Sequence, residues 1–188
     1  MIPARAALLA PGAGSSSDHP TLLALAEAIT PLPVRRFDFP YRLAGKPFPD
    51  KTSVLVDCVL RQAEISVAEA GISPEELLLA GRSMGGRMCS IAVAEGLPAA
   101  GLVLIGYPLH PPNRPERLRV EHFPLLSVPC LFVSGTRDSF ASQHELTAAT
   151  AAINGDVSHR WIEGGRHELN RKADQLAVVE AVLSWLGG

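Results

Sequence analysis

The sequence has few residues of the kinds that cross-link a chain, bind a metal or hold a protein at a membrane. Its three cysteines, Cys58, Cys89 and Cys130, are an odd number without Cys-x-x-Cys spacing, which indicates neither a disulfide framework nor a zinc site. The 17 basic and 19 acidic residues give a formal net charge of −2, too small to favour nucleic acid or an acidic membrane. No apolar run approaches the roughly 18 residues of a membrane span, and the N-terminus has no signal-peptide pattern. We therefore expect a cytoplasmic protein without metal, membrane or nucleic-acid partners.

What is present is an alternation of short apolar runs and longer amphipathic stretches. The 188 residues are 47% hydrophobic and 19% charged, which fits one globular domain over residues 1–188. Ser17 or Asp18 is expected to cap the first helix, and the proline-rich segment 107–129 has room for at most a short helix. The predicted strands cover residues 6–10, 34–39, 77–80, 102–105, 130–134 and 158–162, and the predicted helices 21–29, 52–70, 84–95, 143–153 and 171–186. This order predicts an α/β fold, a mostly parallel sheet of about six strands with helices on both faces.

Ligands of such sheets bind beyond the carboxyl ends of the strands, so the residues that follow each strand are the candidates for function. Ser83 follows one strand within Gly81-Arg82-Ser83-Met84-Gly85, a Gly-x-Ser-x-Gly pattern. The bare pattern is weak, but its place between an apolar strand and a helical stretch is typical of a nucleophile elbow. There the Met84 N–H at the helix start is placed to stabilise an oxyanion. The alternative is a tight structural turn with a capping serine.

A serine hydroxyl needs a base to remove its proton and an acid to orient that base. His167 follows the last strand within Gly164-Gly165-Arg166-His167, and Asp138 follows the strand before it. The chain order Ser83, Asp138, His167 is the order of nucleophile, acid and base in hydrolases with this elbow. The alternatives are an exposed loop histidine and an aspartate that caps a turn.

The loop after the first strand contains Gly12-Ala13-Gly14. A dinucleotide fingerprint would need a third glycine where Ser17 stands, and the Gly-Lys-Ser/Thr of a P-loop is absent. With the three residues above, the loop is best interpreted as the second half of an oxyanion hole, formed by the N–H of Ala13 or Gly14. A glycine-rich turn capped by Asp18 is the alternative.

These segments together resemble the α/β-hydrolase superfamily, in particular a group of short proteins near the dienelactone-hydrolase branch. That group includes a testis-expressed protein and a subunit of the NSL chromatin complex. The likeness extends from about Ala6 to the C-terminus, and the segments that carry it are 79–87, 106–112 and 134–138. The resemblance implies the α/β-hydrolase fold without its first two strands, and a triad of Ser83, Asp138 and His167. The sequence departs from the superfamily in two ways: Pro11-Gly12 stands where the superfamily often has His-Gly, and inserted lid helices are missing, since only residues 107–129 could cover the site.

We expect a serine hydrolase that cleaves a small carboxyl ester or thioester without a cofactor. Tyr107 and His110 are candidates for substrate binding, although a rigid connection whose side chains only pack explains them equally well, and Arg119 and His122 are expected at the surface or at a helix cap. Two other functions remain open: an amidase or peptidase with the same triad, and a non-catalytic interaction module, since fold does not guarantee turnover. Substrate and oligomeric state are not predicted.

Overall fold

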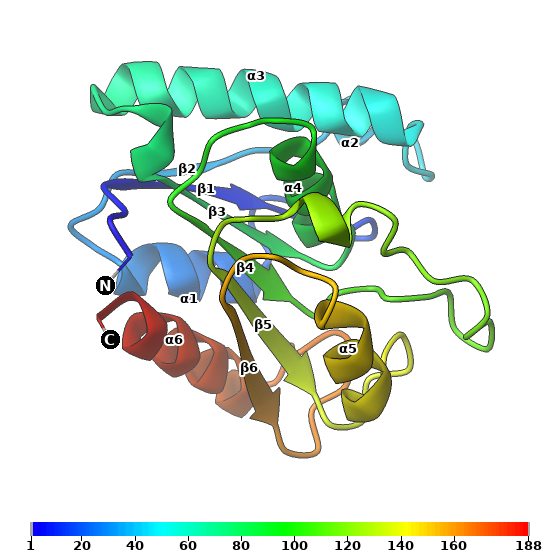
Figure 1. Cartoon of the computed structure of the whole chain (residues 1–188). Helices are drawn as coiled ribbons and strands as arrows, with labels where there is room; N and C mark the ends of the chain where they lie inside the picture. The colour runs from blue at the N-terminus through cyan, green and yellow to red at the C-terminus, as the bar shows by residue number, and fades with distance from the viewer. Residues whose placement is uncertain (1, 188) are drawn as a thin grey trace.

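A computed structural model of the chain describes residues 2–187. Its centre is one sheet in which every neighbouring pair of strands is parallel (Figure 1). The strand order is β2-β1-β3-β4-β5-β6. The strands are β1 (Ala6–Ala10), β2 (Val34–Arg36), β3 (Leu77–Arg82), β4 (Gly101–Ile105), β5 (Cys130–Gly135) and β6 (Val157–Ile162).

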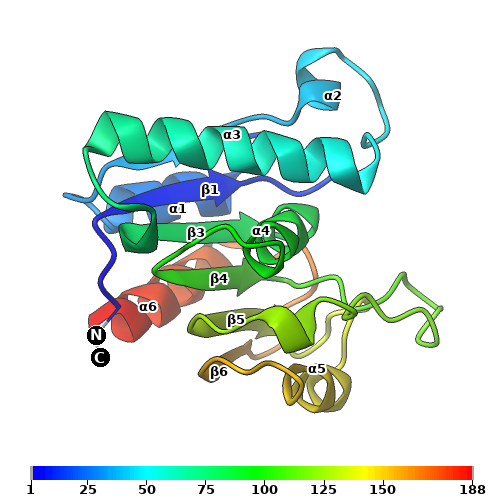
Figure 2. The same cartoon turned by 45° about the horizontal axis from the view of Figure 1, so that its top comes forward.

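Helices cover both faces of the sheet (Figure 2). On one face lie α3 (Thr52–Ala70), α4 (Met84–Ala94) and α5 (Gln143–Thr150), and on the other α1 (Pro20–Ala28) and α6 (Lys172–Gly187). Successive residues of a strand point to opposite faces. Leu8 of β1 accordingly packs in the core beneath α3 and α4, and Leu9 in the core beneath α1 and α6. Short helices α2 (Pro40–Leu43), η1 (Pro74–Glu76) and η2 (Phe123–Leu125) lie in the connections.

The predicted fold class is confirmed, with six parallel strands, helices on both faces and, within residues 2–187, no inserted lid domain. Three local predictions were wrong. The helix expected over residues 143–153 ends at Thr150, and the other two errors concern β2 and the cap of α1. Strand β2 ends at Arg36, because Phe37 and Phe39 turn into the core and Pro40 begins α2. The cap of α1 is His19, whose Nδ1 accepts from the Thr21 N–H at 3.2 Å.

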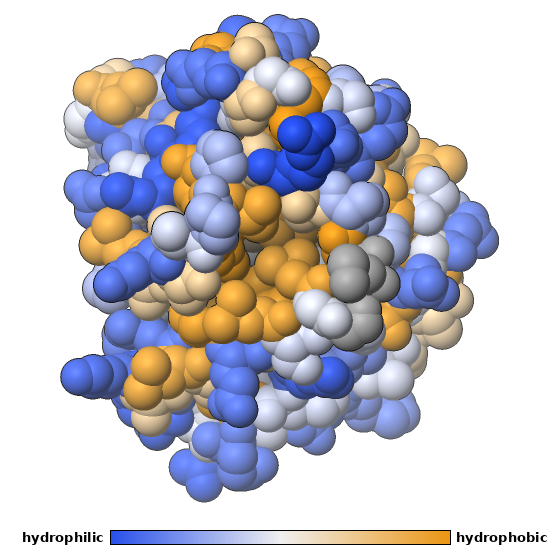
Figure 3. Space-filling model, turned by 90° about the vertical axis from the view of Figure 1, so that its left-hand side faces the viewer, coloured by the Kyte–Doolittle hydropathy of each residue, from blue (hydrophilic) through white to orange (hydrophobic). Residues whose placement is uncertain are grey.

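The polar side chains predicted from the sequence follow the ends of the strands, and the opposite face, at which the strands begin, carries a hydrophobic patch surrounded by hydrophilic residues (Figure 3). Figure 3 shows hydrophobic side chains gathered around a hollow on that face. In the part of the chain described, no helix has the length and apolar character needed to cross a bilayer.

Candidate active site

Ser83 lies on a strained turn between β3 and α4. Its φ of 49° is in the left-handed region that non-glycine residues rarely adopt. The Ser83 N–H donates to Ile105 O at 2.8 Å, which ties the turn to the next strand. A Cβ on Gly85 would lie 2.5 Å from the carbonyl oxygens of Ala10 and Pro11, so only glycine lets α4 start this close to the end of β1. This tight backbone turn directs the Ser83 hydroxyl towards His167.

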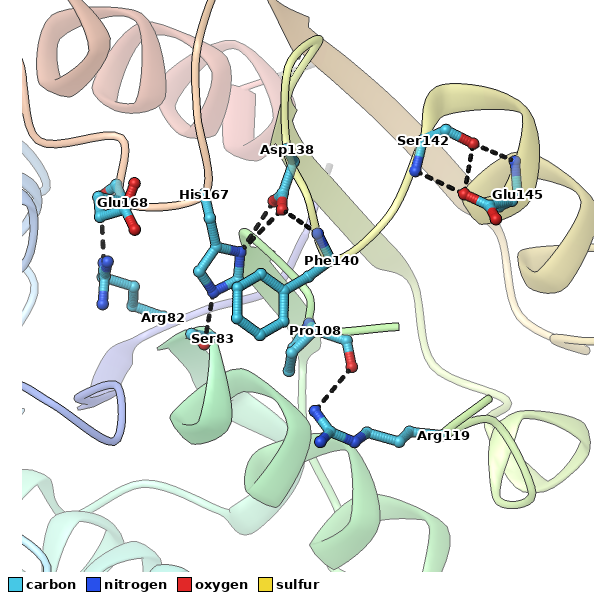
Figure 4. Close-up of polar contacts among 10 residues, drawn as sticks. All are labelled: Arg82, Ser83, Pro108, Arg119, Asp138, Phe140, Ser142, Glu145, His167 and Glu168. Carbon is cyan, nitrogen blue, oxygen red and sulfur yellow. Dashed lines mark hydrogen bonds and ion pairs between the residues drawn. The ribbon is translucent and has the colours of Figure 1, made fainter. Parts of the chain in front are cut away.

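Ser83, His167 and Asp138 form a chain of hydrogen bonds (Figure 4). Ser83 Oγ lies 2.8 Å from His167 Nε2, and His167 Nδ1 lies 2.9 and 3.0 Å from the two carboxylate oxygens of Asp138. The Asp138 side chain is fully buried and also accepts from the Phe140 N–H at 2.8 Å. A carboxylate beside Nδ1 keeps the proton on that nitrogen, which leaves Nε2 free to accept from the serine hydroxyl.

The acid and the base come together because β5 and β6 are neighbours in the sheet. The loop after β5 carries Asp138, and the loop after β6 carries His167. Arg137 N–H donates to Gly165 O at 2.8 Å, so the two loops are joined by a backbone hydrogen bond. A Cβ on Gly135 would overlap the Gly165 backbone, and the glycine therefore permits this close approach.

The predicted oxyanion donors face the same cavity. Met84 is the first residue of α4, and a helix has no internal acceptor for its first N–H groups. Ala13 and Gly14 line the same cavity as Ser83 and Met84. The buried Tyr41 hydroxyl donates to Ala13 O at 2.6 Å and so fixes the peptide that carries the Gly14 N–H.

The structure does not bring Tyr107 or His110 into this cavity. Tyr107 is 1% exposed, packs against Phe123 and Phe132, and donates to Arg119 O at 2.7 Å. His110 is also buried, with Nδ1 2.8 Å from Pro111 O. Both side chains therefore pack within the connection between β4 and β5.

The cavity has a volume of about 620 Å³ and includes residues that the sequence analysis did not assign to it. The Phe140 ring stacks on the His167 ring, with 3.9 Å between centroids. Burial, with a smaller contribution from Arg82, lowers the pKa of His19 to about 4, so this imidazole is neutral. Arg87 and Arg119 complete the wall. Of these residues, only Arg87 could have been placed near the cavity from the sequence, since it lies one helical turn after Ser83.

His122 lies elsewhere, at the start of η2, where its Nε2 is 2.8 Å from Ser90 Oγ. Among residues 2–187, no group of three or more His, Cys, Asp or Glu side chains is arranged to hold a metal ion.

Comparison with solved structures shows the same fold over most of each chain. An alpha-beta serine hydrolase homologue from Coxiella burnetii is 17% identical, with a TM-score of 0.76, and the match covers 97% of this chain and 85% of that one. Dienelactone hydrolase from Anabaena variabilis is 17% identical, with a TM-score of 0.74 and coverage of 98% and 86%. Alpha/beta hydrolase domain-containing protein 10 from mouse is 16% identical, with a TM-score of 0.73 and coverage of 97% and 89%.

A family model described as an alpha/beta hydrolase domain matches residues 3–184, nearly the whole chain. The predicted resemblance to small hydrolases of the dienelactone-hydrolase type is confirmed at this level, and the narrower group with the testis-expressed and chromatin-complex proteins stays a prediction. The chain belongs to the alpha/beta hydrolase domain family.

Proposed function

We propose that this chain is a serine hydrolase that cleaves a carboxyl ester or thioester through an acyl-enzyme on Ser83. The observation that carries the proposal is the 2.8 Å contact between Ser83 Oγ and His167 Nε2, with Asp138 on the other ring nitrogen. Nucleophile, base and acid stand within proton-transfer distance before any substrate is bound.

In the proposed reaction Ser83 Oγ attacks the carbonyl carbon while its proton passes to His167 Nε2. Asp138 accepts from Nδ1–H and stabilises the imidazolium that forms. The N–H groups of Met84 and of Ala13 or Gly14 stabilise the oxyanion. The imidazolium then protonates the departing alcohol or thiol. Water attacks the acyl-enzyme, gives its proton to the same nitrogen and releases the acid, which restores Ser83.

The surroundings of the triad support an acyl-transfer site. The Phe140 ring covers one face of the His167 ring and limits the positions that imidazole can take. The cavity is of the size of small-molecule sites, which run from roughly 300 to 1,000 Å³, and no inserted domain within residues 2–187 closes over it. A small ester with free access from solvent fits this geometry.

A fluorophosphonate probe tests the proposal, because it reacts with an activated serine without the need to know the substrate. We expect labelling of the wild type and none of Ser83→Ala. Ser90→Ala is the matched control: Ser90 also lies 2.8 Å from a histidine nitrogen, but its side chain is buried and its hydroxyl donates to Arg87 O, so labelling should persist. Absence of labelling in the wild type would contradict the proposal and favour a non-catalytic module.

A panel of short esters, thioesters and amides then distinguishes the reaction types. We expect turnover of 4-nitrophenyl esters and acyl thioesters that is abolished in Ser83→Ala. Turnover of amides alone would replace the ester proposal with an amidase or peptidase that uses the same triad.

A further inference from the structure

The cavity around Ser83 is lined by three arginines but only one carboxylate. Arg82 has protein partners: its Nε donates to Glu168 O at 3.2 Å, and the carboxylates of Glu168 and Asp138 act on its charge. Arg87 and Arg119 differ, because no carboxylate in residues 2–187 lies within 4 Å of either guanidinium. Two positively charged residues therefore line the cavity without an ion pair to the described part of the chain.

Two carboxylates in the loops after the strands have partners of their own. Asp138 accepts from His167 and from the Phe140 N–H, and Glu145 accepts from Ser142 at the start of α5. The charge of Glu121 acts on Tyr107 and His122, which lie beside the two arginines, but Glu121 is not within 4 Å of either guanidinium.

The fold fixes the backbone positions of both arginines, whereas their guanidiniums have few partners in the described residues. Arg87 lies one turn after Ser83 on the same side of α4, and its backbone N–H donates to Ser83 O at 3.1 Å. Its buried Nε has no hydrogen-bond partner among residues 2–187. The Arg119 backbone is fixed by the Tyr107 hydroxyl and by an N–H bond to Leu109 O at 2.8 Å. Its Nη1 makes only a long contact of 3.4 Å with Pro108 O (Figure 4).

The electrostatic state of the pair favours an anion. Burial, and next the charge of Arg87, lower the pKa of Arg119. The two positive charges therefore repel each other. Guanidiniums bind carboxylate and phosphate groups through two parallel N–H···O bonds, and an anion placed between them would relieve their repulsion.

We propose that Arg87 and Arg119 form an anion-binding subsite next to Ser83, which takes a carboxylate or phosphate group of the substrate. The inference rests on the proposed function and narrows its substrate to an ester or thioester that carries a negative charge. Tyr107 then has a positioning role, because it holds the Arg119 backbone from outside the cavity.

A pair of esters that differ in charge and by one methyl group tests the subsite. We compare kcat/KM for mono-4-nitrophenyl glutarate, whose acyl chain ends in a carboxylate, with that for its neutral methyl ester. The wild type should prefer the anionic ester. Arg87→Gln and Arg119→Gln should each lower the ratio of kcat/KM for the anionic ester to kcat/KM for the neutral ester by roughly tenfold to a hundredfold, since each removes a charge-assisted hydrogen bond. The exposed Arg117 gives the control Arg117→Gln, which should leave this ratio unchanged.

Inhibition of neutral-ester hydrolysis by glutarate and by glycerol phosphate distinguishes the two sources of the anion. If glutarate or glycerol phosphate inhibits the wild type and this inhibition is lost in Arg119→Gln, the subsite is supported. The stronger of the two inhibitors then identifies the anionic group that the subsite prefers. No inhibition by either, or inhibition unchanged in both arginine variants, would overturn it.

Binding to Ser83→Ala separates this inference from the proposed function, because it needs no turnover. Calorimetry with glutarate monomethyl ester should show binding that weakens with salt and is lost when Arg87→Gln is added. Fluorophosphonate labelling of each single arginine variant reports a folded site. If both esters are hydrolysed equally and the arginine variants lower both alike, the subsite is wrong while the hydrolase stands. If the fluorophosphonate probe fails to label the wild type but the anion binds, the subsite stands and the proposed hydrolase function is wrong.

Discussion

At the scale of single residues, burial sets the protonation of several groups inside the protein. Cys89 and Cys130 lie inside the protein, and burial raises the pKa of each thiol to about 12, which keeps them protonated. Burial, and next the charge of Arg87, lower the pKa of His122 to about 4. The neutral imidazole suits its position, since a second positive charge beside Arg87 would be unfavourable.

The His122 shift predicts a pH dependence of stability. Unfolded, this imidazole takes up a proton near pH 6.5, whereas folded it does so near pH 4, so between these values the unfolded state binds more protons. Its contribution to stability is therefore complete above about pH 6.5 and is lost as the pH falls towards 4. In His122→Gln the free energy of unfolding, measured by urea denaturation, should fall less from pH 7 to 5 than in the wild type.

The control for that measurement is His144→Gln, at an exposed position of α5, which should follow the wild-type curve. If the free energy of unfolding falls equally with pH in the wild type and in His122→Gln, the lowered pKa of His122 does not cause the pH dependence.

At the scale of elements, the site depends on how closely α4 approaches β1 and β3. At the start of α4 the helix backbone packs directly against the backbone at the ends of β1 and β3, with no side chain between them. This contact fixes the Met84 N–H relative to the Ala13-Gly14 loop. A small displacement of the helix would therefore change the proposed oxyanion hole and the direction of the Ser83 hydroxyl together.

Gly85→Ala tests that dependence. The added Cβ would lie 2.5 Å from two backbone oxygens that have no flexible side chain to move away. We expect the free energy of unfolding to fall by about 1–3 kcal/mol, typical of an overpacked contact, and labelling by fluorophosphonate to slow. Gly187→Ala, where a Cβ meets nothing within 4 Å, is the control. Equal stability of Gly85→Ala and the wild type would show that the contact is looser than described.

At the scale of the whole molecule, the order of the elements and the proximity of Ser83, Asp138 and His167 could be predicted from the sequence for one reason. In a parallel sheet with helical crossovers, the residues after each strand gather at one edge, so chain order and strand position were enough to bring Ser83, Asp138 and His167 together. The elements predicted over residues 6–10 and 52–70 have the same bounds as β1 and α3. Pro11 and Gly71 indicate in the sequence where these two elements end.

The rest of the site was not readable because it depends on contacts between distant segments. Phe140, Arg119 and His19 lie in connections whose paths no periodic pattern predicts. Tyr107 follows a strand as the triad residues do, yet its ring turns into the core against Phe123. A single domain over residues 1–188 and a cytoplasmic location stay predictions.

The most direct test of the account is the second-order rate constant for phosphonylation of Ser83 in Asp138→Asn. An asparagine amide beside Nδ1 donates a hydrogen bond to it, which moves the ring proton to Nε2 and removes the acceptor for the Ser83 hydroxyl. We predict a rate roughly a thousandfold or more below the wild type, with the melting temperature retained, while the exposed control Asp156→Asn reacts at the wild-type rate. An Asp138→Asn protein that reacts as fast as the wild type would contradict the proposal that these three residues act as one catalytic unit.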